Sequence, residues 1–596
     1  MPQYQIWFNQ AQTHTFEIEL MITTPKSPQR LSLPAWIPGS YMIREFSKNI
    51  VEINACDDDG DCPISKVDKH TWSVQSKNGP LRIRYTVYAW DLSVRMAHFD
   101  QTHAYFNGTS VFLCAHGHEE APHEVQLHRP KGQEYAKWRI ATTLKPKHED
   151  PTEFGTFSAT NYDDLIDHPV EIADYTRIEF EACGVPHEMV ITGIHRADTD
   201  RLGRDLKTIC EAQIQFFGTP APMERYVFMT MALGGYGGLE HRSSTSLLCS
   251  RNDLPQRHET HTVSEKYKTF LGLCSHEYFH TWNVKRIRPA VFTPYDLSQE
   301  GYTTLLWAFE GITSYYDDLF LRRTGLIDTK TYLGLVAKNA TRILKGNGRT
   351  KQSLADSSFY AWTKFYRQDE NAPNAIVSYY GKGALVALAL DLYLRRETDG
   401  ACSLDCVMRK LWKEHGQPNI GVPENGIERI AEACSGVDLS YFFEQYVHGT
   451  NDPPLQSLLQ DFGVKWTISQ TEKPVEGDWQ AGDLGVRTGT SAGGVKLLNV
   501  YDNGAAQACG LSAGDIVIAI DGIKTEAKTF ATLIASYPIG AELTIHAFRR
   551  DVLMTFTAKL QAKSSHFVHL EAIDSSEIEE TVRLRRQSWL TPNGGR

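Results

Sequence analysis

Long apolar runs are missing from this sequence. No stretch approaches the ~18–20 uninterrupted apolar residues that a membrane helix needs, and the most apolar run, residues 384–394, is broken by Asp391. The first residues, Met-Pro-Gln-Tyr-Gln-Ile-Trp, also lack the basic and apolar regions of a secretory signal. We therefore expect a protein without a membrane span and with a cytoplasmic location.

Cysteine is sparse and follows no pattern. The chain has 11 Cys in 596 residues, spread from Cys56 to Cys509, and it contains no Cys-x-x-Cys pair. Disulfide-rich secreted scaffolds use dense, even-numbered cysteine frameworks, and small zinc-binding modules use closely paired cysteines. Both classes are disfavoured, and we expect reduced thiols.

Basic residues are fewer than acidic residues. The chain has 61 Lys and Arg residues and 72 Asp and Glu residues, which gives a net charge of -11 at pH 7. Because nucleic-acid-binding proteins normally present a basic face, we expect no nucleic-acid partner. Core material is plentiful, with 41% hydrophobic residues in a chain of 596, which is enough for two to four folded domains.

Hydrophobic periodicity divides the chain into four parts and predicts a multidomain α+β fold. Residues 1–170 alternate between apolar and polar positions, which is typical of an antiparallel, sandwich-like β domain. Residues 171–455 are mainly helical, with a strand at 225–232; apolar residues recur every three to four positions in the segments 201–217, 262–284, 303–324, 330–345, 381–397, 402–415, 424–434 and 439–447. Residues 456–567 return to short strands, and residues 568–596 form a charged tail that is either a terminal helix or disordered.

The last strand-rich part resembles a PDZ domain. Residues 510–522 read GLSAGDIVIAIDG, a run typical of such domains, and a helix is expected around residues 528–536. PDZ domains bind a peptide C-terminus at a Gly-Leu-Gly-Phe-like loop, and residues 483–486 read Asp-Leu-Gly-Val here. A peptide C-terminus is therefore a possible partner of this part.

The strongest chemical signal is the segment His276-Glu277-Tyr-Phe-His280. Residues four apart lie on the same face of a helix, so both imidazoles can bind one zinc ion. Glu277 would then stand beside a zinc-bound water whose pKa the metal lowers, and could take its proton. The alternative is a buried helix with two structural histidines.

A catalytic zinc needs a third protein ligand, and the downstream candidates are Asp296, Glu300, Glu310, Asp317 and Asp318. Glu310 is the best of these because it falls in the middle of an apolar helical segment, Leu305–Tyr316. A carboxylate buried there needs a cation nearby, and zinc supplies one. We therefore predict one zinc ion per chain, bound by His276, His280 and Glu310.

These motifs resemble the glycyl aminopeptidase family, which is metallopeptidase family sixty-one of the gluzincins. The resemblance rests on HEYFHTWN at 276–283, KRIRP at 285–289, LWAFEG at 306–311, WIPGSYMIR at 36–44 and HFDQT at 98–102. It covers nearly the whole chain. It implies a β domain, a thermolysin-like, mainly helical catalytic domain and a C-terminal PDZ-like domain.

The resemblance also implies roles for residues outside the zinc motif. Tyr380 in SYYGKG matches the tyrosine that stabilises the tetrahedral oxyanion, with Tyr379 as the alternative. Glu240 in GGYGGLEH, with Gly237 and Gly238, matches the element that binds the substrate main chain and its free ammonium group. Asn283 could hold a zinc ligand in place, and the roles of Lys285 and Arg286 stay open.

The leading hypothesis is a zinc aminopeptidase that hydrolyses the N-terminal peptide bond of peptides whose first residue is glycine or alanine. A PDZ-guided endopeptidase is one alternative. The other is a non-catalytic scaffold in which the PDZ-like domain binds peptides. All three have peptides as partners, and none involves nucleic acid or a membrane.

Overall fold

The computed structural model describes residues 1–259, 263–469, 480–562 and 567–591. These residues form two compact units. Unit 1 comprises Met1–Gly301, Thr324–Leu326 and Leu411–Pro423, and unit 2 comprises Tyr302–Arg323, Ile327–Lys410 and Glu424–Arg596. Among the described helices, none has the length and apolarity needed to cross a membrane.

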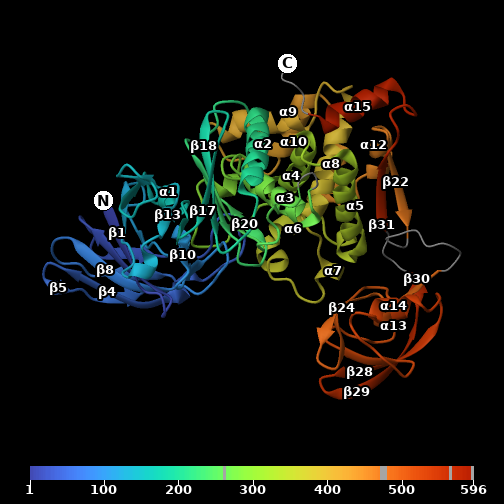
Figure 1. Ribbon diagram of the computed structural model, residues 1–596, viewed down its shortest axis with the longest axis horizontal. Coiled ribbons are helices and arrows are strands. Elements are labelled where there is room, and N and C mark those ends of the chain that lie inside the picture. Colours follow the sequence, from blue (N-terminus) through green and yellow to red (C-terminus); the bar gives the residue numbers. More distant parts are fainter. Residues whose placement is uncertain (260–262, 470–479, 563–566, 592–596) are drawn as a thin grey trace. The chain divides into compact units, whose positions relative to one another are not determined.

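The N-terminal part of unit 1 is built from three sheets (Figure 1). Their strands pair antiparallel, as predicted, with the exception of β1 and β12, which pair in parallel. The largest has eight strands in the order β14 (Lys145–Pro146), β15 (Thr156–Ala159), β12 (His123–Leu127), β1 (Pro2–Gln10), β2 (Thr15–Ile22), β8 (Leu81–Tyr88), β4 (Ile50–Asp57) and β5 (Gly60–Asp61). The two smaller sheets are β13 (Arg139–Ala141), β16 (Val170–Ala173), β10 (His103–Phe106), β9 (Ala97–Phe99), and β11 (Cys114–Ala115), β3 (Gln29–Ser32), β7 (Thr71–Val74), β6 (Ile64–Lys66). Apolar side chains on their inward faces form one continuous core.

A five-stranded sheet and two long helices complete unit 1. The strand order is β17 (Thr176–Ala182), β18 (Val185–Thr192), β19 (Tyr226–Met231), β21 (Ser244–Leu248) and β20 (Gly237–Glu240). Helix α2 (Thr199–Phe217) packs against β17, and α3 (Glu265–Phe279) packs against β20 and β21 (Figure 1). Strand β20 is therefore an edge strand of this sheet and lies under α3.

Unit 2 begins with helices, and the predicted segments are confirmed with small shifts at their ends. The π-helical turn η5 (Trp307–Gly311) leads into α4 (Ile312–Arg323), and α8 (Gly381–Glu397) packs against α4, α5 (Thr329–Lys345) and α12 (Leu455–Gln460). Further α-helices of this part are α6 (Leu354–Phe359), α7 (Ala372–Ala375), α9 (Leu404–Leu411), α10 (Gly426–Ser435) and α11 (Ser440–Phe443). Three more π-helical turns follow α6, α9 and α11, namely η7 (Ala361–Phe365), η8 (Trp412–Gly416) and η9 (Glu444–His448).

The strand-rich part predicted as PDZ-like has its own sheet and core. Its sheet runs β24 (Val486–Ser491), β25 (Gly494–Val500), β26 (Ile516–Ile520), β28 (Glu542–Arg549), β29 (Val552–Lys559), with β27 (Ile523–Lys524) beside β26 and with α13 (Ala505–Ala508) and α14 (Phe530–Ala535) in the same part. Its assignment as a PDZ domain, like the thermolysin-like assignment and the four-part division, stays a prediction. Residues 470–479 and 563–566 of the predicted range 456–567 lie outside the described residues.

The tail is ordered over most of its described length, which decides between the two alternatives drawn from sequence. Strand β31 (Phe567–Ala572) pairs with β22 (Val464–Ser469), and α15 (Glu580–Leu590) follows. Trp589 is fully buried, and its indole N–H donates to the Tyr315 hydroxyl on α4 at 3.1 Å. Residues 592–596 lie outside the described residues.

Candidate metal centre

Helix α3 carries the zinc-binding motif in its last turn. Ser264 caps the helix by accepting a hydrogen bond from the Tyr267 N–H at 3.3 Å. One turn apart, the rings of His276 and His280 lie with centroids 4.6 Å apart and nearly perpendicular planes. Glu277 is only 5% exposed and His280 only 1% exposed, whereas His276 is partly exposed.

The orientation of His280 fits a metal ligand. Its Nδ1 lies 2.6 Å from the main-chain carbonyl oxygen of Asn283, so that Nδ1–H donates and Nε2 is the nitrogen with a lone pair to give. Asn283 was predicted to hold a ligand in place, and it contacts His280 through its main chain. Two imidazoles on one helical face, one of them oriented by a carbonyl, are a donor set that zinc prefers.

Strand β20 lies directly against Glu277. A Cβ atom built on Gly238 would fall less than 3.0 Å from Oε1 of Glu277, so only glycine allows this approach. Two residues further along the strand, the Glu240 carboxylate has an oxygen within 4.8 Å of ligand atoms of both Glu277 and His280. The glycines of the GGYGG segment therefore allow the edge strand and the helix motif to come together.

The Glu240 carboxylate is buried and only partly satisfied. It is 3% exposed, and Oε1 has no hydrogen-bond partner among the described residues. Its other neighbour is Gly39 in the WIPGSYMIR segment, where a Cβ atom would fall 2.5 Å from Oε2. A buried carboxylate with an unused acceptor is a costly arrangement unless a cation or donor joins it.

Arg95, a residue of the N-terminal domain, also contacts strand β20. Its guanidinium donates to the main-chain carbonyl of Gly238 at 3.2 Å. The contact joins residues 143 positions apart, and no motif in the sequence points to Arg95. Its pairing with β20 could be found only once the chain was folded.

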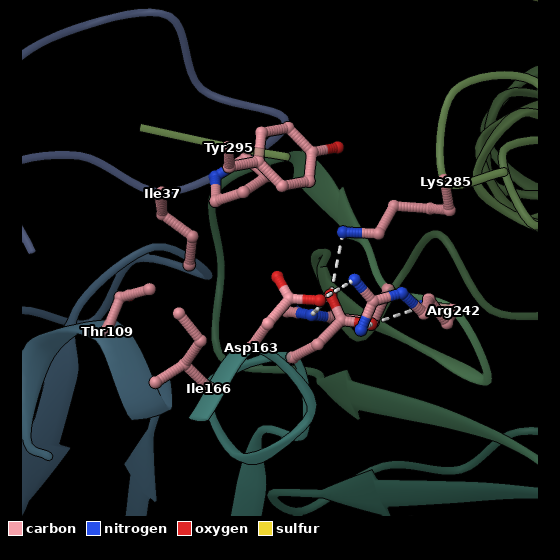
Figure 2. Close-up of a pocket in the computed structure, with 10 residues that line it drawn as sticks. Ile37, Thr109, Asp163, Ile166, Arg242, Lys285 and Tyr295 are labelled. Carbon is pink, nitrogen blue, oxygen red and sulfur yellow. Dashed lines mark hydrogen bonds and ion pairs between the residues drawn. The ribbon is translucent and has the colours of Figure 1, made fainter. Parts of the chain in front are cut away.

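An ionic cluster includes the two residues that follow β20 in the sequence, His241 and Arg242 (Figure 2). Lys285 Nζ lies 2.7 Å from Asp167, the ring of His241 lies 3.4 Å from it, and the main-chain N–H of Arg242 donates to it at 2.9 Å. Figure 2 shows Lys285 and Arg242 pointing to the acidic side chains, opposite Ile37 and other wall residues. Lys285, whose role was open, thus fixes the segment that follows β20.

Charge pairing sets the ionisation of this cluster. Burial by itself raises the pKa of Asp167, but Lys285 and Arg242 outweigh burial and hold that pKa well below its usual value. Burial lowers the pKa of Lys285, and the Asp167 charge more than reverses this, so its pKa is raised. The Arg286 guanidinium donates to three main-chain carbonyls, those of Arg242, Thr281 and Pro222.

In unit 2, Glu310 lies on the π-helical turn η5 and is 2% exposed. This turn crosses the start of α8 at a contact between two glycines, where a Cβ atom on Gly311 would fall 2.6 Å from Cα of Gly383. π-Helical turns are rare and occur often at functional sites. The sequence predicted an ordinary helix here, because a single π-helical turn cannot be recognised from the spacing of apolar residues.

Tyr380 and Tyr379 differ in exposure, although both rings pack against Phe365 and against each other. Tyr379 is fully buried, and its ring packs on Phe365 with centroids 4.7 Å apart. Tyr380 is half-buried, and its hydroxyl lies 3.4 Å from that of Tyr366. Burial and then the negative charge of Glu310 raise the pKa of Tyr380 well above its usual value, so its hydroxyl keeps its proton.

Comparisons with known proteins agree with these observations. A model of the Peptidase M61 N-terminal domain matches residues 3–174, and a model described as M61 glycyl aminopeptidase matches residues 269–386. The crystal structure of an aminopeptidase N family protein from Idiomarina loihiensis is 42% identical, covers 99% of this chain and 100% of its own, and superposes with a TM-score of 0.93.

More remote similarity extends to an M1 zinc metallopeptidase from Deinococcus radiodurans, whose structure is 13% identical, covers 76% of this chain and 94% of its own, and has a TM-score of 0.48. A search of curated proteins found no match. The full-length relative and the two family models are sufficient to assign the family. The chain belongs to the M61 glycyl aminopeptidase family and is a metallopeptidase with zinc as its cofactor.

Proposed function

We propose that this zinc aminopeptidase removes a small N-terminal residue, glycine or alanine, from peptides. One observation carries the proposal: the buried Glu240 carboxylate lies beside Glu277 and His280 on an edge strand. A carboxylate in that position would pair with the free ammonium group of a substrate and limit cleavage to the first peptide bond.

His276, His280 and Glu310 would hold the zinc ion. When bound, zinc polarises the scissile carbonyl and makes a coordinated water more acidic. The support for Glu310 is its burial on the π-helical turn and its position in the LWAFEG segment. Three protein ligands leave one coordination position open, as catalytic zinc sites require.

Glu277 acts as the general base and then as the general acid. It follows His276 directly in the helix and is nearly buried, so its carboxylate is held in one place. It would take a proton from the attacking water and deliver it to the leaving amine. General acid–base catalysis of this kind contributes roughly a hundredfold to ten-thousandfold to the rate.

Strand β20 binds the substrate main chain. It is the edge strand of its sheet among the described strands, and Gly237 and Gly238 bring no side chain between the peptide and Glu277. An extended peptide would add to this edge by main-chain hydrogen bonds, with its ammonium group at Glu240.

Tyr380 supports the oxyanion of the tetrahedral intermediate. Its raised pKa keeps the hydroxyl protonated at neutral pH, which a hydrogen-bond donor requires. Tyr379 is the weaker candidate, because it is fully buried whereas Tyr380 is partly exposed.

Peptides with a free or an acetylated N-terminus test the proposal. We expect cleavage of glycyl and alanyl peptides with a free amine, slower cleavage of leucyl and phenylalanyl peptides, and loss of cleavage after acetylation. Mass spectrometry of the products identifies the bond cut. Glu277→Gln is the control for contaminating peptidases. Cleavage of acetylated peptides by the wild type, but not by this variant, would instead identify an endopeptidase.

A further inference from the structure

A second cluster of possible metal ligands lies in the N-terminal domain, on the β9–β10 hairpin. His98 pairs with Tyr105 across the two strands, and Asp100 and His103 bracket the turn through a main-chain hydrogen bond of 3.0 Å. Because side chains alternate between the faces of a strand, His98, Asp100 and His103 project from the same face. The opposite face carries apolar residues of the core.

The three side chains lie close enough to share one ion. One ligand atom from each lies within 4.8 Å of the other two. The His98 and His103 rings have centroids 4.8 Å apart, and Nε2 of His98 lies 3.4 Å from Oδ2 of Asp100. His98 is 5% exposed and His103 is 1% exposed, whereas the Asp100 side chain is 21% exposed, so the two rings are buried and the carboxylate lies at the solvent side.

His103 is arranged as metal-binding histidines usually are. Its Nδ1 lies 3.0 Å from Oε1 of Glu171, and that same oxygen accepts a hydrogen bond from the Thr192 hydroxyl at 2.7 Å. The carboxylate thus sets the ring orientation and increases the basicity of the other nitrogen. That nitrogen, Nε2, has no hydrogen-bond partner among the described residues although the ring is buried.

We propose that His98, Asp100 and His103 bind a divalent metal ion that is distinct from the peptidase zinc, with Glu171 orienting His103. Two imidazoles and one carboxylate form a donor set that suits zinc and similar borderline ions, and it does not suit calcium or magnesium. The ion would pair with the Asp100 carboxylate and occupy the unused Nε2 atom of the buried His103.

The ion would stiffen the part of unit 1 that positions the substrate strand. Strand β10 continues from His103 to Tyr105, whose hydroxyl donates to Ser246 on β21 at 2.7 Å. Ser246 is paired with Leu239 on β20, next to Glu240. An ion that holds the β9–β10 hairpin in place would also hold the contact between Tyr105 and Ser246. Because Ser246 lies on β21, the strand next to β20 and Glu240, the role of the ion would be structural.

Metal content of the full-length protein, loaded with zinc and dialysed, tests the inference. We expect two zinc ions per chain in the wild type and one in His276→Ala, where only the peptidase site is disrupted. Asp100→Asn should hold one ion, and the combination with His276→Ala should hold close to none. Asparagine still accepts the turn hydrogen bonds that Asp100 receives from Thr102 and His103, so this change removes charge with little effect on the turn.

The matched control is His128→Gln, which replaces a histidine that bonds Gln5 on β1 of the eight-stranded sheet and should keep both ions. His98→Gln is the second variant in case Asp100→Asn does not fold, and circular dichroism checks folding in each case. A cobalt titration of His276→Ala should give a visible d–d band that Asp100→Asn abolishes. One ion per chain in the wild type, or two ions insensitive to both hairpin variants, would overturn the proposal and leave His103–Glu171 as an ion pair.

Discussion

Gly238 of the edge strand β20 lies against the carboxylate of Glu277, with no room for a side chain between them. The contact joins the strand proposed to bind the substrate to the group proposed to move its protons. The short distance between Gly238 and the Glu277 carboxylate explains why glycine is needed in the segment before Glu240.

Gly238→Ala should sharply reduce activity with a small effect on stability. The added Cβ would fall less than 3.0 Å from Oε1 of Glu277, so either the strand or the carboxylate must shift. A displacement of about 1 Å can cost roughly a hundredfold in rate. The loss should appear in kcat with glycyl-anilide as substrate.

Gly334→Ala is the control for this change. It adds the same methyl group in helix α5, where the structure has open space, and should leave kcat unaltered. It should also stabilise the helix by about 0.5–1 kcal/mol, measured by urea unfolding. Equal kcat values for Gly238→Ala and Gly334→Ala would refute the close contact.

Glu240→Gln should weaken the use of substrates with a free amine. Replacing the carboxylate removes a charged hydrogen bond to the ammonium group, which is typically worth about 1.5–3 kcal/mol. We expect kcat/KM to fall roughly 10-fold to 150-fold, with zinc content unchanged. A variant with full kcat/KM, or one that has lost its zinc, would argue against a role in binding the amine.

Much of this site could be predicted from sequence because the chemistry is local. His276, Glu277 and His280 lie within five residues on one helix, so their spacing alone predicts a shared face. Glu310 was chosen because a charged residue among aromatic residues needs a partner. Both predictions depend on the spacing of residues along one helix, and this spacing is the same in the folded protein as in the sequence.

The missing parts depend on contacts between distant residues. Arg95 and Gly238, or Asp167 and Lys285, are more than one hundred positions apart, and neither pair leaves a local pattern. The tail was equally ambiguous: its charged helix buries only three of its described side chains, those of Arg586, Trp589 and Leu590. One aromatic residue among charged residues is too weak a periodic signal to predict that this helix packs against the helices of unit 2.

Tyr380→Phe should lower kcat and leave KM nearly unchanged. The phenol would stabilise charge that develops only in the transition state, and removing one such donor costs about a hundredfold to a thousandfold in kcat. Tyr379→Phe is the matched control, because its ring packing on Phe365 is kept. A larger loss in Tyr379→Phe than in Tyr380→Phe would reverse the assignment.

The Asp167–Lys285 pair should make a large contribution to stability that depends on pH. Removing one member of a buried ion pair leaves the other uncompensated, so Asp167→Asn and Lys285→Met should each cost about 3–5 kcal/mol. The double variant should cost less than the sum of the two. Urea unfolding at pH 7 provides the three values, and additive losses would contradict the pairing.

The pH dependence follows from the directions of the two shifts. The pKa of Asp167 is depressed in the folded protein, so its stabilisation is present above the unfolded value of about 3.9 and is lost as pH falls toward the folded value. The pKa of Lys285 is raised, so its contribution is present below about 10.4 and is lost as pH rises through the folded value. The cost of Asp167→Asn should therefore be constant from pH 6 to 8 and shrink in acid.

Trp589→Ala should detach helix α15 and lower the melting temperature. Its side chain is fully buried, its indole N–H donates to Tyr315 at 3.1 Å, and its carbonyl accepts from the Arg323 guanidinium at 3.1 Å. Truncating a buried tryptophan costs about 3–5 kcal/mol. Leu584→Ala on the same helix is 51% exposed and should change stability by less than about 0.5 kcal/mol. Limited proteolysis should then cut the tail of Trp589→Ala first, because its anchoring contact is lost, whereas equal cutting of both variants would show that Trp589 does not hold the helix.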